Sequence, residues 1–132
     1  MTDNPINLQK IGDARGTLVV AEFGKHLPFA VKRSYFIYGT QPDHPRGFHA
    51  HKSLDQVFIC IQGACDLIIE DVSGKRTLHL NNPAQAVHVG PMVWHEMHNF
   101  TTDCIFLALA SDTYDENDYI RDYRTFQMQL KS

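Results

Sequence analysis

Short runs of β-branched and aromatic residues recur along the chain, and residues that favour turns stand between them. The runs span residues 17–23, 29–38, 56–62, 65–71, 76–81, 85–90 and 104–111. Glycine, proline, asparagine and aspartate separate them, in stretches such as "GTQPDHPRG" and "NNPA". Strands at this spacing, with no helix between them, predict an antiparallel sandwich or barrel.

The hydrophobic period supports this prediction locally and changes near the C-terminus. Two runs alternate apolar residues with a histidine, His79 in one and His88 in the other. These two histidines are expected to face solvent or a neighbouring strand rather than to bind a ligand. From Tyr119 to Leu130 apolar residues recur every three or four positions, after the acidic "YDEND". This period predicts one amphipathic helix packed on the barrel.

The composition is that of an ordinary globular protein, with 43% hydrophobic residues, 20% charged residues and a formal net charge of -3. At 132 residues, a single domain spanning 1–132 is expected. The mild acidity gives no reason to expect nucleic acid or a membrane surface as partner. No apolar run approaches the roughly 20 residues that cross a bilayer. No signal peptide is evident, which favours a cytoplasmic location.

Cysteine and histidine usage narrows the candidate chemistry. The three cysteines lie within or beside apolar runs and form no C-x-x-C pair, so buried reduced thiols are expected. Among the eight histidines, His49 and His51 stand one residue apart, with Arg46 on the approaching turn. In a strand these two imidazoles project to the same side. They could be structural, hydrogen-bonded residues, but their basic flank favours acid–base chemistry near neutral pH.

The two histidines belong to a longer pattern, in which H-x-H is followed by a glycine and then by H-(x)3-N. Gly63 completes the first part, and His95 and Asn99 form the second. The pattern resembles the paired motifs of the cupin superfamily. It implies an all-β, cupin-like antiparallel jelly-roll barrel, to which the C-terminal helix would be added.

One position departs from the cupin pattern, because Gln56 stands where cupins usually have glutamate. A cupin metal centre commonly takes three histidines and one carboxylate, and a neutral amide is a weaker ligand. Lys52 would add positive charge at the mouth of the barrel, beside Arg46. Lys32 and Arg33, which are adjacent in the sequence, would add more. This charge opposes a metal ion and suits an anionic substrate. We therefore expect no metal and no other cofactor.

Beyond these motifs, most of the chain resembles one family. The blocks "DARGTLVVAE", "LPFAVKRSYFIY", "PRGFHAHKSLDQVFICIQGACDLII", "VGPMVWHEMHNF" and "LALASDTYDENDYIRDY" are similar to the nucleotide-sugar 3,4-ketoisomerases, cupin-like enzymes that act on dTDP-4-keto-6-deoxyglucose. The resemblance implies that the ketone at C4 of the sugar moves to C3 through an enediol. It places the chain in 3-amino-3,6-dideoxyhexose biosynthesis, which feeds surface polysaccharide such as lipopolysaccharide.

The resemblance also implies roles for individual residues. His49 and His51 would supply the proton transfers, without a decision between them as the C3 base. Tyr35 would contact the sugar oxygens, and Arg33 and Arg46 would hold the diphosphate. Lys52 and Gln56 are expected to line the substrate site.

Two finer expectations come from the same resemblance. Arg15 and His95 resemble the branch of the family that gives the galacto configuration at C4, so His95 would contact the sugar rather than a metal. The family's dimers exchange N-terminal strands, and "TLVVAEF" is an apolar strand that could pair in this way. A homodimer is therefore expected.

Three other functions compete with the isomerase. A metal-dependent cupin oxidoreductase or dioxygenase would explain the histidines but not Gln56. A 3,5-epimerase-like enzyme shares the fold and substrate, but its chain is longer and lacks these blocks. A non-catalytic sugar-binding cupin would explain the arginines but not the adjacent histidines.

Overall fold

The computed structural model describes residues 5–132. Residues 1–4, which belong to the N-terminal stretch in which no signal peptide is evident, lie outside the described part. The described residues form twelve strands, one 3-10 turn and one helix. In chain order these are β1 (Pro5–Asn7), β2 (Gln9–Asp13), β3 (Gly16–Val20), β4 (Arg33–Ile37), β5 (Arg46–His51), β6 (Gln56–Gln62), β7 (Cys65–Asp71), β8 (Gly74–Leu80), β9 (Gln85–Val89), β10 (Trp94–His98), β11 (Ile105–Ala110), the 3-10 turn η1 (Glu116–Asp118), β12 (Tyr119–Ile120) and α1 (Tyr123–Lys131).

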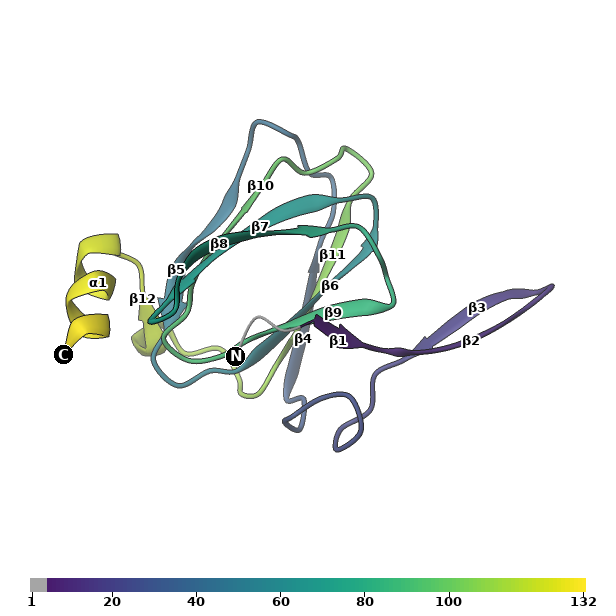
Figure 1. Cartoon of the computed structure of the whole chain (residues 1–132), viewed down its shortest axis with the longest axis horizontal. Coiled ribbons are helices and arrows are strands. Elements are labelled where there is room, and N and C mark those ends of the chain that lie inside the picture. The colour runs from purple at the N-terminus through teal and green to yellow at the C-terminus, as the bar shows by residue number, and fades with distance from the viewer. Residues whose placement is uncertain (1–4) are drawn as a thin grey trace.

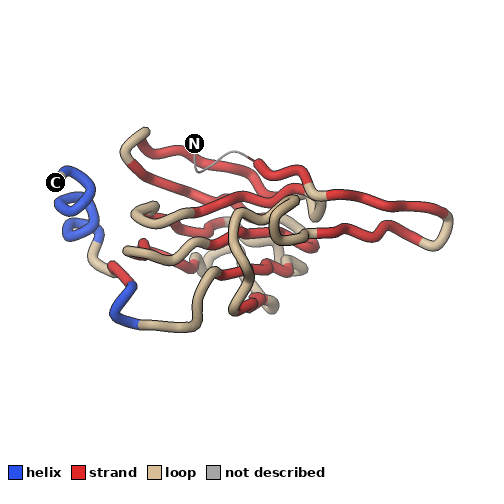
Figure 2. Tube along the Cα trace, turned by 90° about the horizontal axis from the view of Figure 1, so that it is seen from below, coloured by secondary structure: helices blue, strands red, loops and turns tan. Residues whose placement is uncertain are grey.

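Two five-stranded antiparallel sheets form the body of the molecule. One has the order β1-β9-β6-β11-β4 and the other the order β12-β5-β10-β7-β8. The hairpin β2-β3 projects from this body at the end opposite α1 (Figure 1; Figure 2). The all-β, cupin-like barrel with a C-terminal helix is confirmed. The described chain has no helix that is long and apolar enough to cross a membrane.

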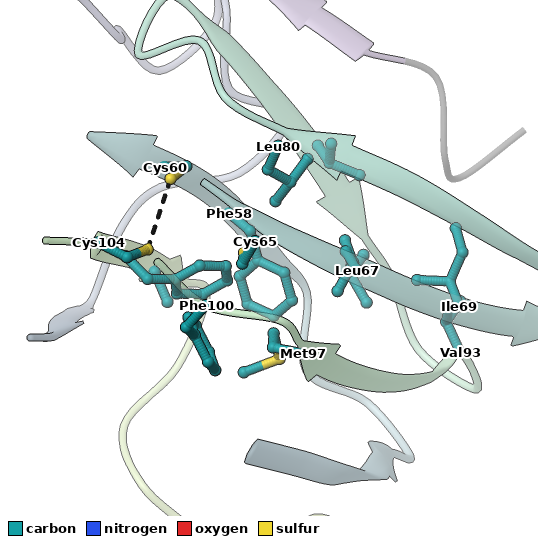
Figure 3. Close-up of a cluster of buried hydrophobic side chains, with 14 residues drawn as sticks. Phe58, Cys60, Cys65, Leu67, Ile69, Leu80, Val93, Met97, Phe100 and Cys104 are labelled. Atoms are coloured by element: carbon teal, nitrogen blue, oxygen red, sulfur yellow. Dashed lines mark hydrogen bonds between the residues drawn. The ribbon is translucent and has the colours of Figure 1, made fainter. Parts of the chain in front are cut away.

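The largest hydrophobic core fills the space between the two sheets. Alternate residues of β6, such as Phe58 and Cys60, point inward and meet side chains such as Leu67 from the facing sheet (Figure 3). Cys60 and Cys104 bring their sulfur atoms to 3.6 Å. All three cysteines are buried and free, as expected from their apolar surroundings.

The outer face of the first sheet is also apolar. Val57 and Ile59 point to this side of β6 and pack beneath Leu8 and Leu27 of the N-terminal segment. β6 is therefore buried on both faces over most of its length, which explains its continuous apolar run.

The C-terminal helix begins later than the sequence predicts. α1 starts at Tyr123 with Asp122 as its N-cap, and Phe126 is its buried residue. Tyr119 lies instead in β12, which pairs with β5. The predicted helix was therefore wrong at its start, where Tyr119 packs against the barrel as part of a strand. The rest of the predicted helix is confirmed.

His79 and His88 face solvent or a neighbouring strand, as the alternation of apolar residues around them predicts. His79 is exposed and pairs with Asp66 of the neighbouring strand at 2.7 Å. His88 lies 2.7 Å from Asp55 on the outer side of its sheet.

Candidate active site

A β-bulge in β5 determines which side chains share the face of His49. Gly47 and Phe48 both have left-handed backbone conformations, with φ of 95° and 63°, and the pairing with β10 shifts register beside them. In a regular strand, residues three apart face opposite sides. The extra residue turns Arg46 to the same side, so that Arg46 and His49 line one cavity.

Three histidines converge inside the barrel. His95 on β10 lies opposite His49, and their ring centroids are 4.4 Å apart. The rings of His49 and His51 lie 5.0 Å apart, nearly perpendicular. One ring nitrogen from each of the three lies within 4.8 Å of the others. The sequence predicted that His49 and His51 project together and that His95 belongs to the same site, and the fold places the three rings side by side.

Backbone carbonyl groups fix two of these rings. Nδ1 of His49 lies 3.1 Å from the carbonyl oxygen of Gly47, and Nδ1 of His95 lies 3.3 Å from that of Val93. A carbonyl oxygen only accepts hydrogen bonds, so each Nδ1 carries the proton. Nε2 of each ring therefore keeps its lone pair and can accept a proton.

His51 has a different partner, the carboxylate of Asp118. Nδ1 of His51 lies 3.3 Å from Oδ2 of Asp118. Oδ2 also accepts a hydrogen bond from the backbone N–H of Leu54, and Oδ1 accepts one from the backbone N–H of Ser53. Asp118 ends the 3-10 turn η1, 67 residues beyond His51 in the sequence. No local pattern in the sequence indicates this contact, because it depends on where the C-terminal segment crosses the barrel.

Burial keeps the three imidazoles neutral. It lowers the pKa of His49 to about 4 and the pKa of His95 well below its usual value of 6.5. The pKa of His51 is also lowered by burial, while the charge of Asp118 opposes the shift. At neutral pH the cluster is thus a set of neutral proton acceptors.

These shifts predict a loss of stability in mild acid. In the unfolded chain His49 binds a proton near pH 6.5, but in the folded chain only near pH 4, so the unfolded state binds more protons between these values. Its contribution to the free energy of unfolding is present above pH 6.5 and should fall by roughly 2 kcal/mol between pH 8 and pH 5. Urea unfolding of the wild type and of His49→Asn at both pH values measures this difference. Equal pH dependence in the two proteins would contradict it.

Tyr35 and Gln56 form a neutral pair beside the histidines. The phenol of Tyr35 donates to Oε1 of Gln56 at 2.6 Å, and burial raises the pKa of Tyr35 to about 12. Gln56 is 1% exposed and its Nε2 has no hydrogen-bond partner among the described residues. With its proton committed to the amide, the Tyr35 oxygen is left to accept a hydrogen bond, and Gln56 Nε2 is left to donate one.

A cavity of about 530 Å³ opens above His49 and His95. Three guanidinium groups line it, from Arg33, Arg46 and Arg121. The guanidinium of Arg33 lies over the ring of Tyr35 at 5.5 Å. The cavity therefore combines proton acceptors at its base with positive charge at its mouth.

The C-terminal segment supplies residues that the sequence did not single out. The ring of Tyr119 lies 4.9 Å from that of His49 and 4.3 Å from that of His51. Arg121 stacks over Tyr119 at 4.2 Å and forms an ion pair with Glu116 at 2.8 Å. The motif "YDENDYIRDY" thus forms one wall of the cavity.

Gln56, which was expected to line the site, is buried and lines neither cavity, and two further expected residues lie elsewhere in this chain. Arg15 is at the tip of the β2-β3 hairpin, where its side chain is 90% exposed and pairs with Asp13. Lys52 follows β5 but is exposed and lines neither the cavity above His49 nor the one beside His51.

The donor set fits a metal ion only in part. The three imidazoles could each offer a nitrogen, but the position that a carboxylate would take holds Gln56, whose Oε1 already accepts from Tyr35. The carboxylate of Asp118 is directed at Nδ1 of His51. The cluster thus lacks an anionic ligand to balance a divalent cation.

Gln56→Glu is expected to raise the affinity for Zn²⁺ or Ni²⁺ by about tenfold or more, because it adds the missing anionic ligand. Titration calorimetry on chelator-treated protein measures the change, with Gln56→Met as the matched control. If Gln56→Glu binds no more tightly than the control, the arginines at the mouth, rather than the amide, exclude the ion.

Comparisons with known proteins agree with this geometry. The model of the family FdtA, described as "WxcM-like, C-terminal", matches residues 1–131. A TDP-4-oxo-6-deoxy-alpha-D-glucose-3,4-oxoisomerase from Aneurinibacillus thermoaerophilus is 50% identical over 98% of this chain and 94% of its own. The crystal structure of a 3,4-ketoisomerase from Helicobacter canadensis is 42% identical, with a TM-score of 0.96 over 100% of this chain and 99% of that one.

A third relative was crystallised with a sugar nucleotide. It is a histidine-to-asparagine mutant of the 3,4-ketoisomerase QdtA from Thermoanaerobacterium thermosaccharolyticum, in complex with TDP-4-keto-6-deoxyglucose. It is 37% identical to this chain, with a TM-score of 0.95 over 98% of this chain and 94% of that one. This protein therefore belongs to the FdtA family of cupin-like nucleotide-sugar 3,4-ketoisomerases.

Proposed function

We propose that this protein converts dTDP-4-keto-6-deoxy-D-glucose to the dTDP-3-keto-6-deoxy sugar by metal-free acid–base catalysis. One observation carries the proposal: neutral imidazoles with free Nε2 atoms lie at the base of a cavity whose mouth holds three arginines. The proton acceptors suit a carbon acid, and the arginines suit a diphosphate. Such an intramolecular redox change needs no redox cofactor, because one carbon is oxidised as its neighbour is reduced.

The reaction requires two protons to leave and two to arrive. A base takes the C3 proton, and the electron pair of the broken C–H bond forms the C3–C4 double bond as O4 gains a proton. The enediol then loses the proton of O3, the C3 carbonyl forms, and C4 gains a proton. His49 lines the cavity with its Nε2 free, so it is placed to exchange protons with the ring carbons.

The neutral pair and the arginines would stabilise the enediol and hold the nucleotide. Tyr35 lines the cavity and can accept from a sugar hydroxyl, while Gln56 holds the phenol proton from behind. Arg33 and Arg46, with guanidinium groups that can bind two phosphate oxygens at once, would hold the diphosphate. These interactions gain strength as negative charge develops on O4.

We assign the product to the galacto branch, with Arg15 and His95 as the residues that support it. His95 lines the cavity beside His49. Arg15 is at the tip of the projecting hairpin and would reach a cavity only in the partner of a dimer.

We further propose a homodimer in which the β2-β3 hairpins are exchanged. Ile11 and Leu18 of this hairpin are 56% and 57% exposed. Between the hairpin and the outer face of the first sheet lies a groove of about 710 Å³, lined by apolar residues such as Ile59 and Leu107. Covering these surfaces by a second copy would bury apolar area that a monomer leaves in water. One domain spanning residues 1–132 would then act as a cytoplasmic dimer.

Turnover in deuterated water tests the proposed function. Chelator-treated protein is incubated with dTDP-4-keto-6-deoxyglucose, and the sugar protons are followed by NMR. A 3-keto product with deuterium at C4 is the expected result, and the configuration at C4 tests the branch. Activity that appears only with added iron or manganese would indicate a metal-dependent enzyme. Binding without turnover under either condition would indicate a sugar-binding protein.

A further inference from the structure

His51 faces a different cavity from His49. The sugar cavity is lined by His49 and His95, whereas His51 lines a second cavity of about 220 Å³. Tyr119 and Arg33 line both and form the wall between them. His51 itself is 4% exposed.

The second cavity is polar and reaches solvent. Its lining includes the exposed residues Asp112, Thr113 and Asp115 together with Ser53. At about 30 Å³ per water molecule, its volume holds several waters with many hydrogen-bond partners. The carboxylate of Asp118 lines it as well, 3.3 Å from Nδ1 of His51.

His51 thus lies between the sugar-side histidine and this water-accessible cavity. Its Nδ1 is turned to Asp118 and the second cavity. Its other ring nitrogen is left toward the cluster, where one nitrogen of each histidine lies within 4.8 Å of the others. Two hydrogen bonds through one water molecule cover such a distance.

We propose that His51, Asp118 and the second cavity form a proton outlet, through which His49 exchanges the proton it takes from the sugar with solvent while the sugar stays bound. The inference rests on the proposed isomerase function. His51 then acts through His49 and does not touch the sugar.

The proposed transfers balance. The C3 proton moves to Nε2 of His49 as the C3–C4 double bond forms. It passes by a water molecule to Nε2 of His51, while Nδ1 of His51 releases its own proton toward Asp118 and the water of the second cavity. The reverse sequence brings a solvent proton back to His49. No net proton is gained, and no oxidant or reductant is needed.

Isotope exchange on excess enzyme tests the outlet. Substrate deuterated at C3 is bound in ordinary water to a molar excess of enzyme until the 4-keto and 3-keto sugars reach equilibrium. The 4-keto sugar is then recovered, and its deuterium at C3 is measured by mass spectrometry. An open outlet replaces the deuterium with protium in the wild type. A closed site returns the same deuterium to C3.

Two variants close the outlet in different ways. Ser53→Leu fills the second cavity while keeping the backbone N–H that Asp118 accepts, and Ser53→Ala is its matched control with the cavity left open. Asp118→Asn removes the charge that holds a proton on His51. We expect Ser53→Leu and Asp118→Asn to retain several-fold more deuterium at C3 than the wild type and Ser53→Ala do.

Two results would overturn the proposal. One is retention of deuterium by the wild type, which would mean that solvent does not reach the bound site. The other is complete loss from Ser53→Leu, as complete as from Ser53→Ala. Failure of the proposed function is distinguishable from both, because no 3-keto sugar would then form with any variant.

Discussion

His49→Asn is expected to lower kcat by about 100-fold or more, because it removes a positioned proton acceptor. His49 is the histidine of the H-x-H pair that lines the sugar cavity, and its Nδ1 is anchored on the Gly47 carbonyl. Asparagine keeps the polar contact with the backbone but cannot accept a proton from carbon at neutral pH. Steady-state turnover of dTDP-4-keto-6-deoxyglucose measures the change.

The control for this variant is binding of TDP, which should stay close to that of the wild type since the diphosphate is assigned to the arginines. The kcat of His51→Asn is also expected to fall by about 100-fold, because this variant removes the second proton acceptor of the H-x-H pair. Rates near the wild-type value in both variants would remove the histidines from the proton-transfer step.

Gly63→Ala is expected to lower the free energy of unfolding by about 3 kcal/mol, from left-handed strain combined with overpacking. Gly63 has φ of 71° in the turn between β6 and β7. A Cβ there would lie 2.9 Å from Cα of Cys104 and 2.6 Å from Oδ1 of Asp103, and would also overlap Thr101. The first of these atoms belongs to the backbone, which cannot move aside without disturbing β11.

Gly39→Ala is the matched control for this substitution. Gly39 has nearly the same φ, 69°, but no atom lies within 4 Å of an added Cβ. The free energy of unfolding of Gly39→Ala should therefore fall only by the roughly 1 kcal/mol that the left-handed conformation costs alanine. Urea unfolding measures both variants, and an equal loss in the two would show that the crowding at Gly63 costs nothing.

The sequence predicted the strands that consist of a clear apolar run between turn residues. β6 and β7 begin and end where their apolar runs do, between turn residues. β10 was not predicted, because its outward side chains, Trp94, Glu96 and His98, hide the alternation in a polar and aromatic mixture. β1 and β2 are short and largely exposed, so they carry no hydrophobic pattern.

The site was predictable where it depends on neighbours in the chain. The H-x-H spacing placed His49 and His51 together, and Gln56 was recognised as a departure. The contact of Asp118 with His51 and the packing of Tyr119 on both rings depend on β12 pairing with β5, which no local pattern encodes. Arg46 shares a face with His49 only because of the bulge, which breaks the period that sequence reasoning relies on.

The late position of β12 in the chain has a consequence for synthesis. The histidines lie on strands that are complete before the turn carrying Asp118 has been made. A nascent or truncated chain that ends after β11 would contain every strand of both sheets except β12, yet have no carboxylate for His51 and no Tyr119 ring against the cluster. Completion of this wall of the cavity is thus a late event in synthesis, and a fragment of this kind would also lack Ile120 and Phe126, which bury Ala50 and Trp94 in the complete chain.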